Sequence, residues 1–364
     1  MPRLESLHPA EIERWPTLSV IVPACDEADK IEPAARSLLA LDYPGMEIIF
    51  VDDRSTDETG PIIDRLAADD TRVRAIHVSE LPEGWLGKVH ALDTGLRVSS
   101  GELVLFTDAD VHFRPGAMRR AVALVESRGL DFLAVLPRLW ATSMLLDSLI
   151  AAFIRQYLLL MTRPWALSRP GSRSFIGVGA FNLLRRSALE GTPGLEWLRM
   201  EVGDDAALGQ MMRQSGRRCG AAAAFEHVAL HWHRTVAEAC RGAEKGWSTV
   251  CRFSLARSIA LAAGGLALEA APVLALAPLA FPSVRWIGYA GAAVAAAFAF
   301  TIVALGRWAR VRVVPGLLSP LTSVVSAAGL LRAAWLGRRR GGVMWRGTLY
   351  PDAALRAGRR LKFP

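Results

Sequence analysis

The sequence predicts an α/β domain followed by a helical membrane region, and three observations lead to this fold class. From Leu18 onward, short runs rich in β-branched residues alternate with amphipathic stretches. The short runs are almost continuously apolar, as strands are when helices cover both faces of a parallel sheet. After Arg257 the composition becomes rich in alanine, leucine and valine. We therefore expect a Rossmann-like domain that binds ligands at the carboxyl ends of its strands, and membrane helices after it.

The elements of the predicted sheet follow one another after an N-terminal extension at residues 1–17. We expect strands at 18–24, 46–53, 73–80 and 103–110, with helices that run to Leu41, from Asp57 and from Lys88. Beyond Phe113 the pattern predicts a helix at 115–127, a strand at 132–137 and a long apolar helix near 144–165. This last helix fits either core packing or an in-plane position at a membrane surface.

Composition excludes several classes of protein. With 364 residues, 52% hydrophobic and 21% charged, the chain is not mostly disordered. The net charge of +8 is spread along the sequence, so we do not expect nucleic acid as a partner. Four scattered cysteines show no zinc-site spacing and fit a reducing cytosol. The first residues lack the apolar run of a signal peptide, so the domain is expected to stay on the side where it is made.

Two segments, 258–281 and 287–305, have the length and composition of transmembrane helices. A third, 317–335, is weaker because it contains Pro320 and Arg332. We therefore expect a catalytic or binding domain at 18–257, a membrane region at 258–336 and a basic cytoplasmic tail at 337–364. Glu269, inside the first segment, is expected to face protein or water.

Arginine clusters set the expected topology. They precede the first segment, follow the second and follow the third (Arg252 and Arg257; Arg307, Arg310 and Arg312; Arg338 to Arg340). Only an even number of membrane crossings keeps all three arginine clusters on the cytoplasmic side. The sequence therefore favours two spans plus a re-entrant or interfacial helix; three crossings with the tail outside is the alternative.

Acidic residues gather where the predicted strands end. Asp108 and Asp110 end the fourth strand, one residue apart, and could hold Mg²⁺ or Mn²⁺ on a diphosphate. A turn or helix cap is the simpler explanation of such a pair. Glu27 and Asp53 end the first two strands, where their oxygens could accept hydrogen bonds from a base and a ribose. Near Asp53, at least one of Ser55, Thr56 and Asp57 is expected to cap the next helix.

Lys88 opens a helix after Gly84-Trp85-Leu86-Gly87, so its ammonium group and the helix N-terminus can both face phosphate. Lysine is rare in this chain, which favours a specific role for Lys88.

This series of motifs resembles the family 2 glycosyltransferases with the GT-A fold, over roughly residues 18–247. The resemblance implies nucleotide contacts at Pro23, Glu27, Asp53, Lys88 and Asp108, and a metal-binding pair at Asp108 and Asp110. The stretch ELPEGWLGKVHALDTGL and the C-terminal WRGTLYP are similar to members that glycosylate membrane lipids of the ceramide, carotenoid and hopanoid type.

The resemblance also implies a catalytic base. An acidic pair stands at Asp204 and Asp205, where Asp205 matches the base and Asp204 replaces the usual glutamate. One carboxylate takes the proton of an acceptor hydroxyl in a single displacement that inverts the anomeric carbon. An N-terminal helix cap is the alternative role of the pair.

Further candidates lie beyond this pair. Processive relatives carry Gln-x-x-Arg-Trp where this chain matches only Trp247, which argues against polymer synthesis and leaves Arg241 or Lys245 as possible diphosphate contacts. His231 and His233 are possible metal ligands, although hydrogen-bonded structural histidines are more common. The glycine-rich stretch 175–181 could let the backbone approach a sugar.

The expected function is metal-assisted transfer of a sugar from a nucleotide diphosphate-sugar, with UDP-sugar favoured, to a membrane lipid. The expected location is a bacterial-type cytoplasmic membrane with several spans and a cytoplasmic catalytic domain. A non-catalytic nucleotide-sugar-binding membrane protein is one alternative. A nucleotidyltransferase is the other, because it also uses carboxylates at strand ends with a metal ion.

Overall fold

A computed structural model of the chain describes residues 1–7, 12–158, 163, 166–167, 169 and 172–362. The chain divides into two compact units. The first, here called the sheet unit, comprises residues 1–138, 161–230 and 358–364; the second, the helical unit, comprises 139–160 and 231–357. The chain thus passes from the sheet unit to the helical unit twice, and returns to the sheet unit at residue 161 and again at residue 358. These units follow contacts in space, so the domain boundaries at 257 and 336 stay predictions.

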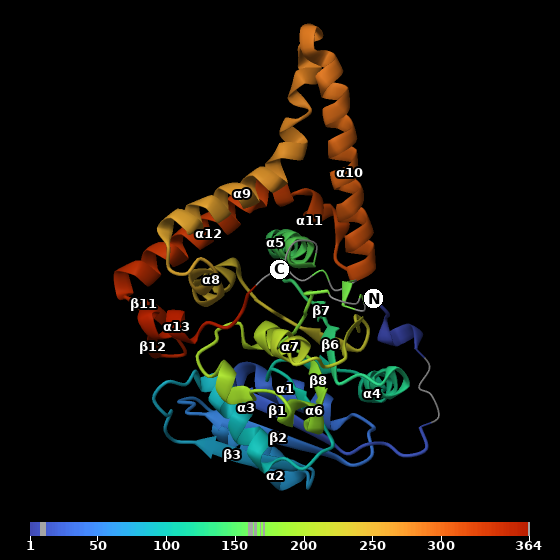
Figure 1. Ribbon diagram of the computed structural model, residues 1–364, viewed down its shortest axis with the longest axis vertical. Coiled ribbons are helices and arrows are strands. Elements are labelled where there is room, and N and C mark those ends of the chain that lie inside the picture. Colours follow the sequence, from blue (N-terminus) through green and yellow to red (C-terminus); the bar gives the residue numbers. More distant parts are fainter. Residues whose placement is uncertain (8–11, 159–162, 164–165, 168, 170–171, 363–364) are drawn as a thin grey trace. The chain divides into compact units, whose positions relative to one another are not determined.

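A seven-stranded sheet in the order β3-β2-β1-β4-β8-β6-β9 forms the centre of the sheet unit (Figure 1). Its strands are β1 (Leu18–Ala24), β2 (Met46–Asp53), β3 (Val73–Val78), β4 (Leu103–Phe106), β6 (Phe132–Leu136), β8 (Asn182–Arg185) and β9 (Cys219–Ala223). The first four run parallel, as predicted. The expectation of a wholly parallel sheet is wrong, because β8 runs antiparallel to both β4 and β6.

Helices connect the strands, and the first four of them lie at the predicted places. They are α1 (Ala28–Leu39), α2 (Thr59–Asp69), α3 (Gly87–Val98), α4 (Ala117–Arg128), α6 (Arg186–Glu190) and α7 (Asp204–Gln214). Helix α3 packs on β1 and β2, whereas α4 and α7 pack against β6. Two short strands, β5 (His112–Phe113) and β10 (Val228–Leu230), pair with each other outside the main sheet. The N-terminal extension is also attached, since Arg3 forms a bridge to Ala223 and Leu4 is fully buried.

Burial explains why the first strands read as continuous apolar runs. Every residue of β1 and of β4 is buried. Strand β1 lies between β2 and β4, so the strand order reverses beside it. Open α/β sheets bind ligands at such a reversal, outside the carboxyl ends of the strands. The fold therefore places the ends of β1, β2 and β4 at the expected binding edge.

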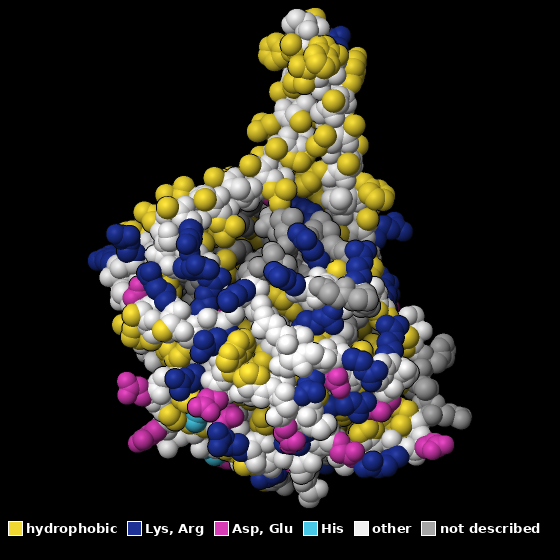
Figure 2. Space-filling model, in the orientation of Figure 1, with side chains coloured by type: hydrophobic (Ala, Val, Ile, Leu, Met, Phe, Trp, Pro, Cys, Tyr) yellow, Lys and Arg dark blue, Asp and Glu magenta, His cyan; other side chains and the backbone are white. Residues whose placement is uncertain are grey.

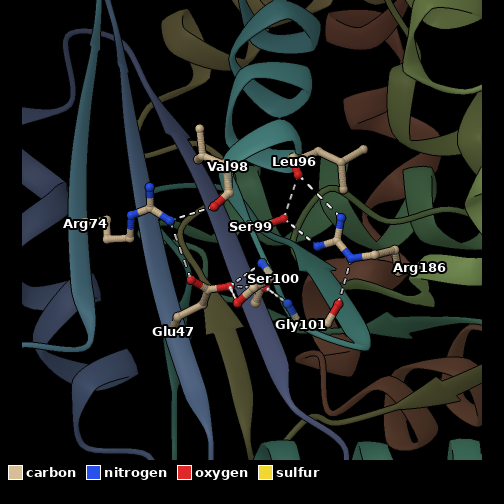
Figure 3. Close-up of polar contacts among 9 residues, drawn as sticks. Glu47, Arg74, Leu96, Val98, Ser99, Ser100, Gly101 and Arg186 are labelled. Carbon is tan, nitrogen blue, oxygen red and sulfur yellow. Dashed lines mark hydrogen bonds and ion pairs between the residues drawn. The ribbon is translucent and has the colours of Figure 1, made fainter.

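At the amino ends of these strands, a network of polar contacts surrounds Glu47 at the start of β2 (Figure 3). Its Oε1 accepts hydrogen bonds from the Ser19 hydroxyl (2.6 Å) and from the backbone N–H of Ser100 (2.6 Å). The Ser19 hydroxyl in turn accepts from the N–H of Gly101 (2.7 Å). Arg186 donates to the Gly101 carbonyl oxygen (2.8 Å). These bonds join the starts of β1, β2 and β4.

The helical unit contains α5 (Met144–Gln156), α8 (Val236–Val250), α9 (Leu255–Leu274), α10 (Arg285–Ala309), α11 (Val313–Leu317) and α12 (Ser319–Arg340), followed by β11 (Gly342–Trp345), β12 (Thr348–Pro351) and most of α13 (Asp352–Gly358). Helix α5 ends earlier than the expected 144–165 segment, of which residues 159–162 and 164–165 lie outside the described part.

Two segments of the helical unit, Leu255–Ala280 and Pro282–Ala309, are long and apolar enough to cross a membrane. On the face shown in Figure 2, hydrophobic side chains cover this α9–α10 pair. Within the described residues α12 is not a candidate span by the same criteria. One side of α12 packs on α8 and α9, whereas Leu321, Val324 and Trp335 are exposed. This pattern fits an interfacial helix better than a third span.

Glu269 in α9 is fully buried, which confirms that it faces protein. Its partners are Arg155 of α5, which forms a short ion pair with it, and the Ser319 hydroxyl, which donates to its Oε2 (2.7 Å). Gln156 donates to its Oε1 (3.1 Å). Arg155 is itself 4% exposed and lies over the Phe298 ring of α10. A charge within an apolar helix is thus balanced by a neighbouring helix.

Candidate active site

Four charged residues from three segments line one pocket in the sheet unit. They are Lys88, Asp108, Asp204 and Asp205. The Lys88 ammonium lies 2.7 Å from Asp108 Oδ1 and 3.5 Å from Asp204 Oδ2. The sequence predicted each of these residues separately, and the fold brings them together.

Secondary structure places each charge at this edge. Lys88 lies in the first turn of α3, Asp108 follows the end of β4, and both acidic residues of the pair open α7. Burial alone would lower the pKa of Lys88, but the charges of Asp108, Asp204 and Asp205 raise it above its ordinary value. Lys88 therefore stays cationic at neutral pH.

Asp205 is held by a backbone donor from another part of the chain. Its Oδ2 accepts a hydrogen bond from the N–H of Gly179 (2.9 Å), and its Oδ1 accepts from Ala206 N–H (2.7 Å). Gly203 occupies the cap position of α7 and supplies no side-chain cap. The acidic pair therefore lies inside the first turn, where the helix dipole favours negative charge.

Glycines in the stretch 175–181 permit close packing around this pair. A β-carbon on Gly177 would lie 1.7 Å from the backbone oxygen of Asp205, and one on Gly179 would lie 2.6 Å from Asp108 Oδ2. A β-carbon on Gly209 of α7 would lie 2.0 Å from the Ile176 oxygen. The glycines thus let α7 and Asp108 approach this backbone, a role that the sugar-contact interpretation of the stretch missed.

Asp110 belongs to a second acidic group beside the pocket. Its pKa is raised to about 7 by burial and by the neighbouring charges of Asp108 and Glu27, although Lys30 lowers it. Lys30 Nζ lies 3.4 Å from Glu27 Oε2 and 4.0 Å from Asp110 Oδ2. Carboxylate oxygens are the donors that Mg²⁺ and Mn²⁺ prefer, but the described residues here include no group of three arranged to hold a cation, so the metal-binding pair Asp108 and Asp110 stays a prediction.

Asp53 lies 5% exposed at the end of β2, where Arg54 Nε donates to its Oδ1 (2.9 Å). A β-carbon on Gly87 would lie 2.0 Å from Asp53 Oδ2, so only glycine lets the N-terminus of α3 approach this carboxylate. Pro23 lies opposite Val51 in the parallel β1–β2 pair. These contacts connect the nucleotide candidates with the start of α3.

Asp57 bonds to the start of α2, but the cap position itself is occupied by Glu58, which supplies no side-chain cap. The Oδ1 of Asp57 accepts from the N–H of Thr59, the first residue of α2 (3.0 Å), and its Oδ2 accepts from Ala28 N–H (3.0 Å). Asp26, with a positive φ of 51°, accepts from the N–H of Thr56 (2.8 Å). The loops after β1 and β2 are therefore bonded to each other.

The remaining candidates belong to the helical unit. His231 packs against Trp140 with ring centroids 5.1 Å apart, and His233 stacks on Trp232. Lys245 places its ammonium 4.2 Å from the Trp345 ring centroid, whereas Arg241 is exposed. The Trp247 side chain lies outside the described part. Among the described residues no group of three or more His, Cys, Asp and Glu is arranged to hold a metal, so the histidine ligands stay a prediction.

Residues 19–191 match the family model described as glycosyl transferase family 2. These residues form a family 2 glycosyltransferase domain. It contains β1 to β4 and β8, together with Lys88, Asp108, Asp110 and Gly179. The acidic pair of α7 lies just beyond the matched range.

A solved structure supports the fold of the sheet unit. The mannosyltransferase PcManGT from Pyrobaculum calidifontis, in complex with GDP-Man and Mn²⁺, is 21% identical, with a TM-score of 0.53. The comparison covers 93% of this chain and 89% of that one. The sheet unit therefore has a GT-A-like α/β architecture.

Curated relatives match only part of the chain. The GalNAc(5)-diNAcBac-PP-undecaprenol beta-1,3-glucosyltransferase of Campylobacter jejuni is 35% identical over 28% of this chain and 32% of its own length. The beta-monoglucosyldiacylglycerol synthase of Nostoc is 31% identical over 30% of this chain and 24% of its own. The chain thus matches about a third or less of the length of these two relatives.

Proposed function

We propose that this protein is an inverting glycosyltransferase that moves a sugar from a nucleotide diphosphate-sugar to a membrane lipid or another hydrophobic acceptor. The observation that carries this proposal is the single pocket in which Lys88 and Asp108 meet the carboxylates of Asp204 and Asp205. Cationic and acidic groups side by side suit a reaction that releases a diphosphate and removes a proton.

Asp205 acts as the general base. The Gly179 N–H holds Oδ2 and fixes the direction of the carboxylate. The carboxylate takes the proton of an acceptor hydroxyl while that oxygen forms a bond to the anomeric carbon. The bond from this carbon to the diphosphate oxygen breaks on the opposite face, so the configuration inverts. Asp204 holds Lys88 through its Oδ2.

The donor is bound at the carboxyl ends of β1, β2 and β4. Asp53 and Glu27 accept hydrogen bonds from the nucleoside, with Pro23 beside them, and Lys88 faces the diphosphate. We favour a UDP-sugar. Asp108 and Asp110 would hold Mg²⁺ or Mn²⁺, which when bound neutralises the leaving diphosphate.

A lipid acceptor is supported by two independent features. Two relatives are named for undecaprenol-linked and diacylglycerol substrates. The chain also carries two apolar segments long enough to span a bilayer. We propose location in a bacterial-type cytoplasmic membrane, with the sheet unit in the cytoplasm. The partial match to the processive signature, Trp247 without its glutamine and arginine, favours single transfer.

Nucleoside diphosphate release tests this proposal. Detergent-purified protein is incubated with a panel of nucleotide sugars and host lipids, with Mn²⁺ or with a chelator. We expect release from at least one donor, dependent on metal and stimulated by lipid. If no nucleotide sugar in the panel gives nucleoside diphosphate release, the transferase assignment is contradicted. Pyrophosphate release from a nucleoside triphosphate would indicate a nucleotidyltransferase.

A further inference from the structure

The last described residues of the chain pack onto the segment that leads into α7. Both belong to the sheet unit, which the chain re-enters at Gly358. A β-carbon on Gly358 would lie 2.2 Å from Met200 Cβ, so this contact requires glycine. Leu361 is 7% exposed, and a β-carbon on Gly203 would lie 3.0 Å from its Cδ2. The tail is therefore closely packed against residues 200–203.

A buried carboxylate bonds the tail and this segment together. Glu201 is 3% exposed. Its Oε2 accepts hydrogen bonds from the backbone N–H groups of Arg360 (2.5 Å) and Leu361 (2.8 Å), and its Oε1 accepts from Gly203 N–H (3.0 Å). Three charge-assisted bonds offset the cost of burying the charge. Glu201 thus fixes the residue immediately before α7 to the end of the chain.

A second side chain binds the tail from α7 itself. Gln210 is 5% exposed and forms a reciprocal pair with the backbone of Lys362. Its Nε2 donates to the Lys362 oxygen (2.8 Å), and its Oε1 accepts from the Lys362 N–H (3.0 Å). Both Glu201 and Gln210 thus bind the tail through its backbone.

We propose that residues 358–362 form a C-terminal strap that positions Asp204 and Asp205, with Glu201 and Gln210 as its positioning residues. This inference rests on the proposed function, in which Asp205 is the base. Asp205 is aligned by one bond of 2.9 Å to Gly179, so a small shift of α7 would misdirect the carboxylate. A displacement of about 1 Å costs up to about 100-fold in rate.

The strap follows the helical unit in the sequence. The positioning of the acidic pair therefore depends on a segment that lies beyond both apolar segments in the chain.

Steady-state kinetics of the full-length protein test the strap. Deletion of residues 358–364 and Glu201→Gln, which sets an amide against backbone donors, are each expected to lower kcat by about 10- to 100-fold. The donor KM should stay within about twofold of the parent value, because the donor contacts are unchanged. Lys362→Ala is the matched control, since the side chain is exposed and only the backbone binds Gln210.

Hydrogen exchange gives a readout that does not depend on turnover. Both variants should show faster exchange of the amides of residues 204–210, while β1 and β4 keep their protection. Unchanged kcat and unchanged exchange would overturn the strap. Joint loss of donor affinity and of protection throughout the sheet would also overturn it, because it would show general unfolding. An inactive parent with strap-dependent exchange would instead refute the proposed function, and with it the catalytic role of the strap.

Discussion

At the scale of single residues, Lys88 is the central residue of the site, because it contacts carboxylates that are far apart in the sequence. Its ammonium lies 2.7 Å from Asp108 and 3.5 Å from Asp204. Asp205 is oriented differently, through the N–H of Gly179. The two neighbouring aspartates therefore have different environments, which allows their roles to be separated by mutation.

Asp205→Asn is expected to lower kcat by about 10²- to 10⁴-fold, because the amide oxygen still accepts from Gly179 but cannot take a proton. The donor KM should change little. Asp204→Asn is the comparison, since it weakens one contact to Lys88 and keeps the Lys88–Asp108 pair. Rates of nucleoside diphosphate release measure both. A larger loss in Asp204→Asn than in Asp205→Asn would reverse the assignment of the base.

At the scale of elements, the Glu269–Arg155 pair joins α9 to α5. Glu269→Ala leaves a buried guanidinium without its carboxylate, which costs about 3–5 kcal/mol. We expect a clear drop in the unfolding midpoint of the detergent-solubilised protein. The double variant Glu269→Leu with Arg155→Met removes both charges and should recover most of the stability. A single variant as stable as the parent would show that the pair does not hold these helices.

The network at the start of β2 predicts a dependence of stability on pH. Burial alone would raise the pKa of Glu47. The hydrogen bonds from Ser19 and Ser100 together lower it by more, so the pKa lies below its ordinary value. The Glu47 carboxylate therefore stabilises the folded protein fully above its unfolded pKa of about 4.3, and this stabilisation is lost as the pH falls through its pKa in the folded protein.

Glu47→Gln should therefore destabilise the protein at neutral pH by about 1–3 kcal/mol, and less as the pH is lowered. Thermal unfolding between pH 7 and pH 3 measures the difference. Glu83→Gln, at an exposed position, is the control and should follow the parent curve. A constant difference over this range would exclude the charge of Glu47 as the cause.

The elements differ in how much of them the sequence predicts. Strands β1 and β2 were predicted at their observed bounds, because complete burial leaves an uninterrupted apolar run. The antiparallel strand β8 was missed, since Asn182–Arg185 has only two apolar residues between polar ones. The charged site residues were found from their places at strand and helix ends. Gly179 and Glu201 were not found, because their importance comes from contacts with residues distant in the chain.

At the scale of the whole molecule, the path of the chain restricts the topology. The sheet unit includes both residues before Leu230 and residues after Gly358, and Glu201 binds the backbone of Leu361. In a membrane-bound chain, residues 358–362 must then lie on the same side of the membrane as the rest of the sheet unit. This requires an even number of crossings, which supports two spans with α12 at the interface rather than three spans.

Cysteine labelling in intact cells tests this topology. In a variant whose four native cysteines are replaced, Ser283→Cys lies between the spans predicted from the sequence at 258–281 and 287–305 and should react with a membrane-impermeant maleimide. Lys362→Cys in the tail and Glu190→Cys on the exposed surface of the sheet unit should react only after permeabilisation. Labelling of Lys362→Cys from outside, with Glu190→Cys protected, would require a third crossing. Such labelling would also separate the tail from Glu201 and so exclude the strap in the membrane-bound protein. Protection of both Lys362→Cys and Glu190→Cys in intact cells would instead place the tail and the rest of the sheet unit in the cytoplasm.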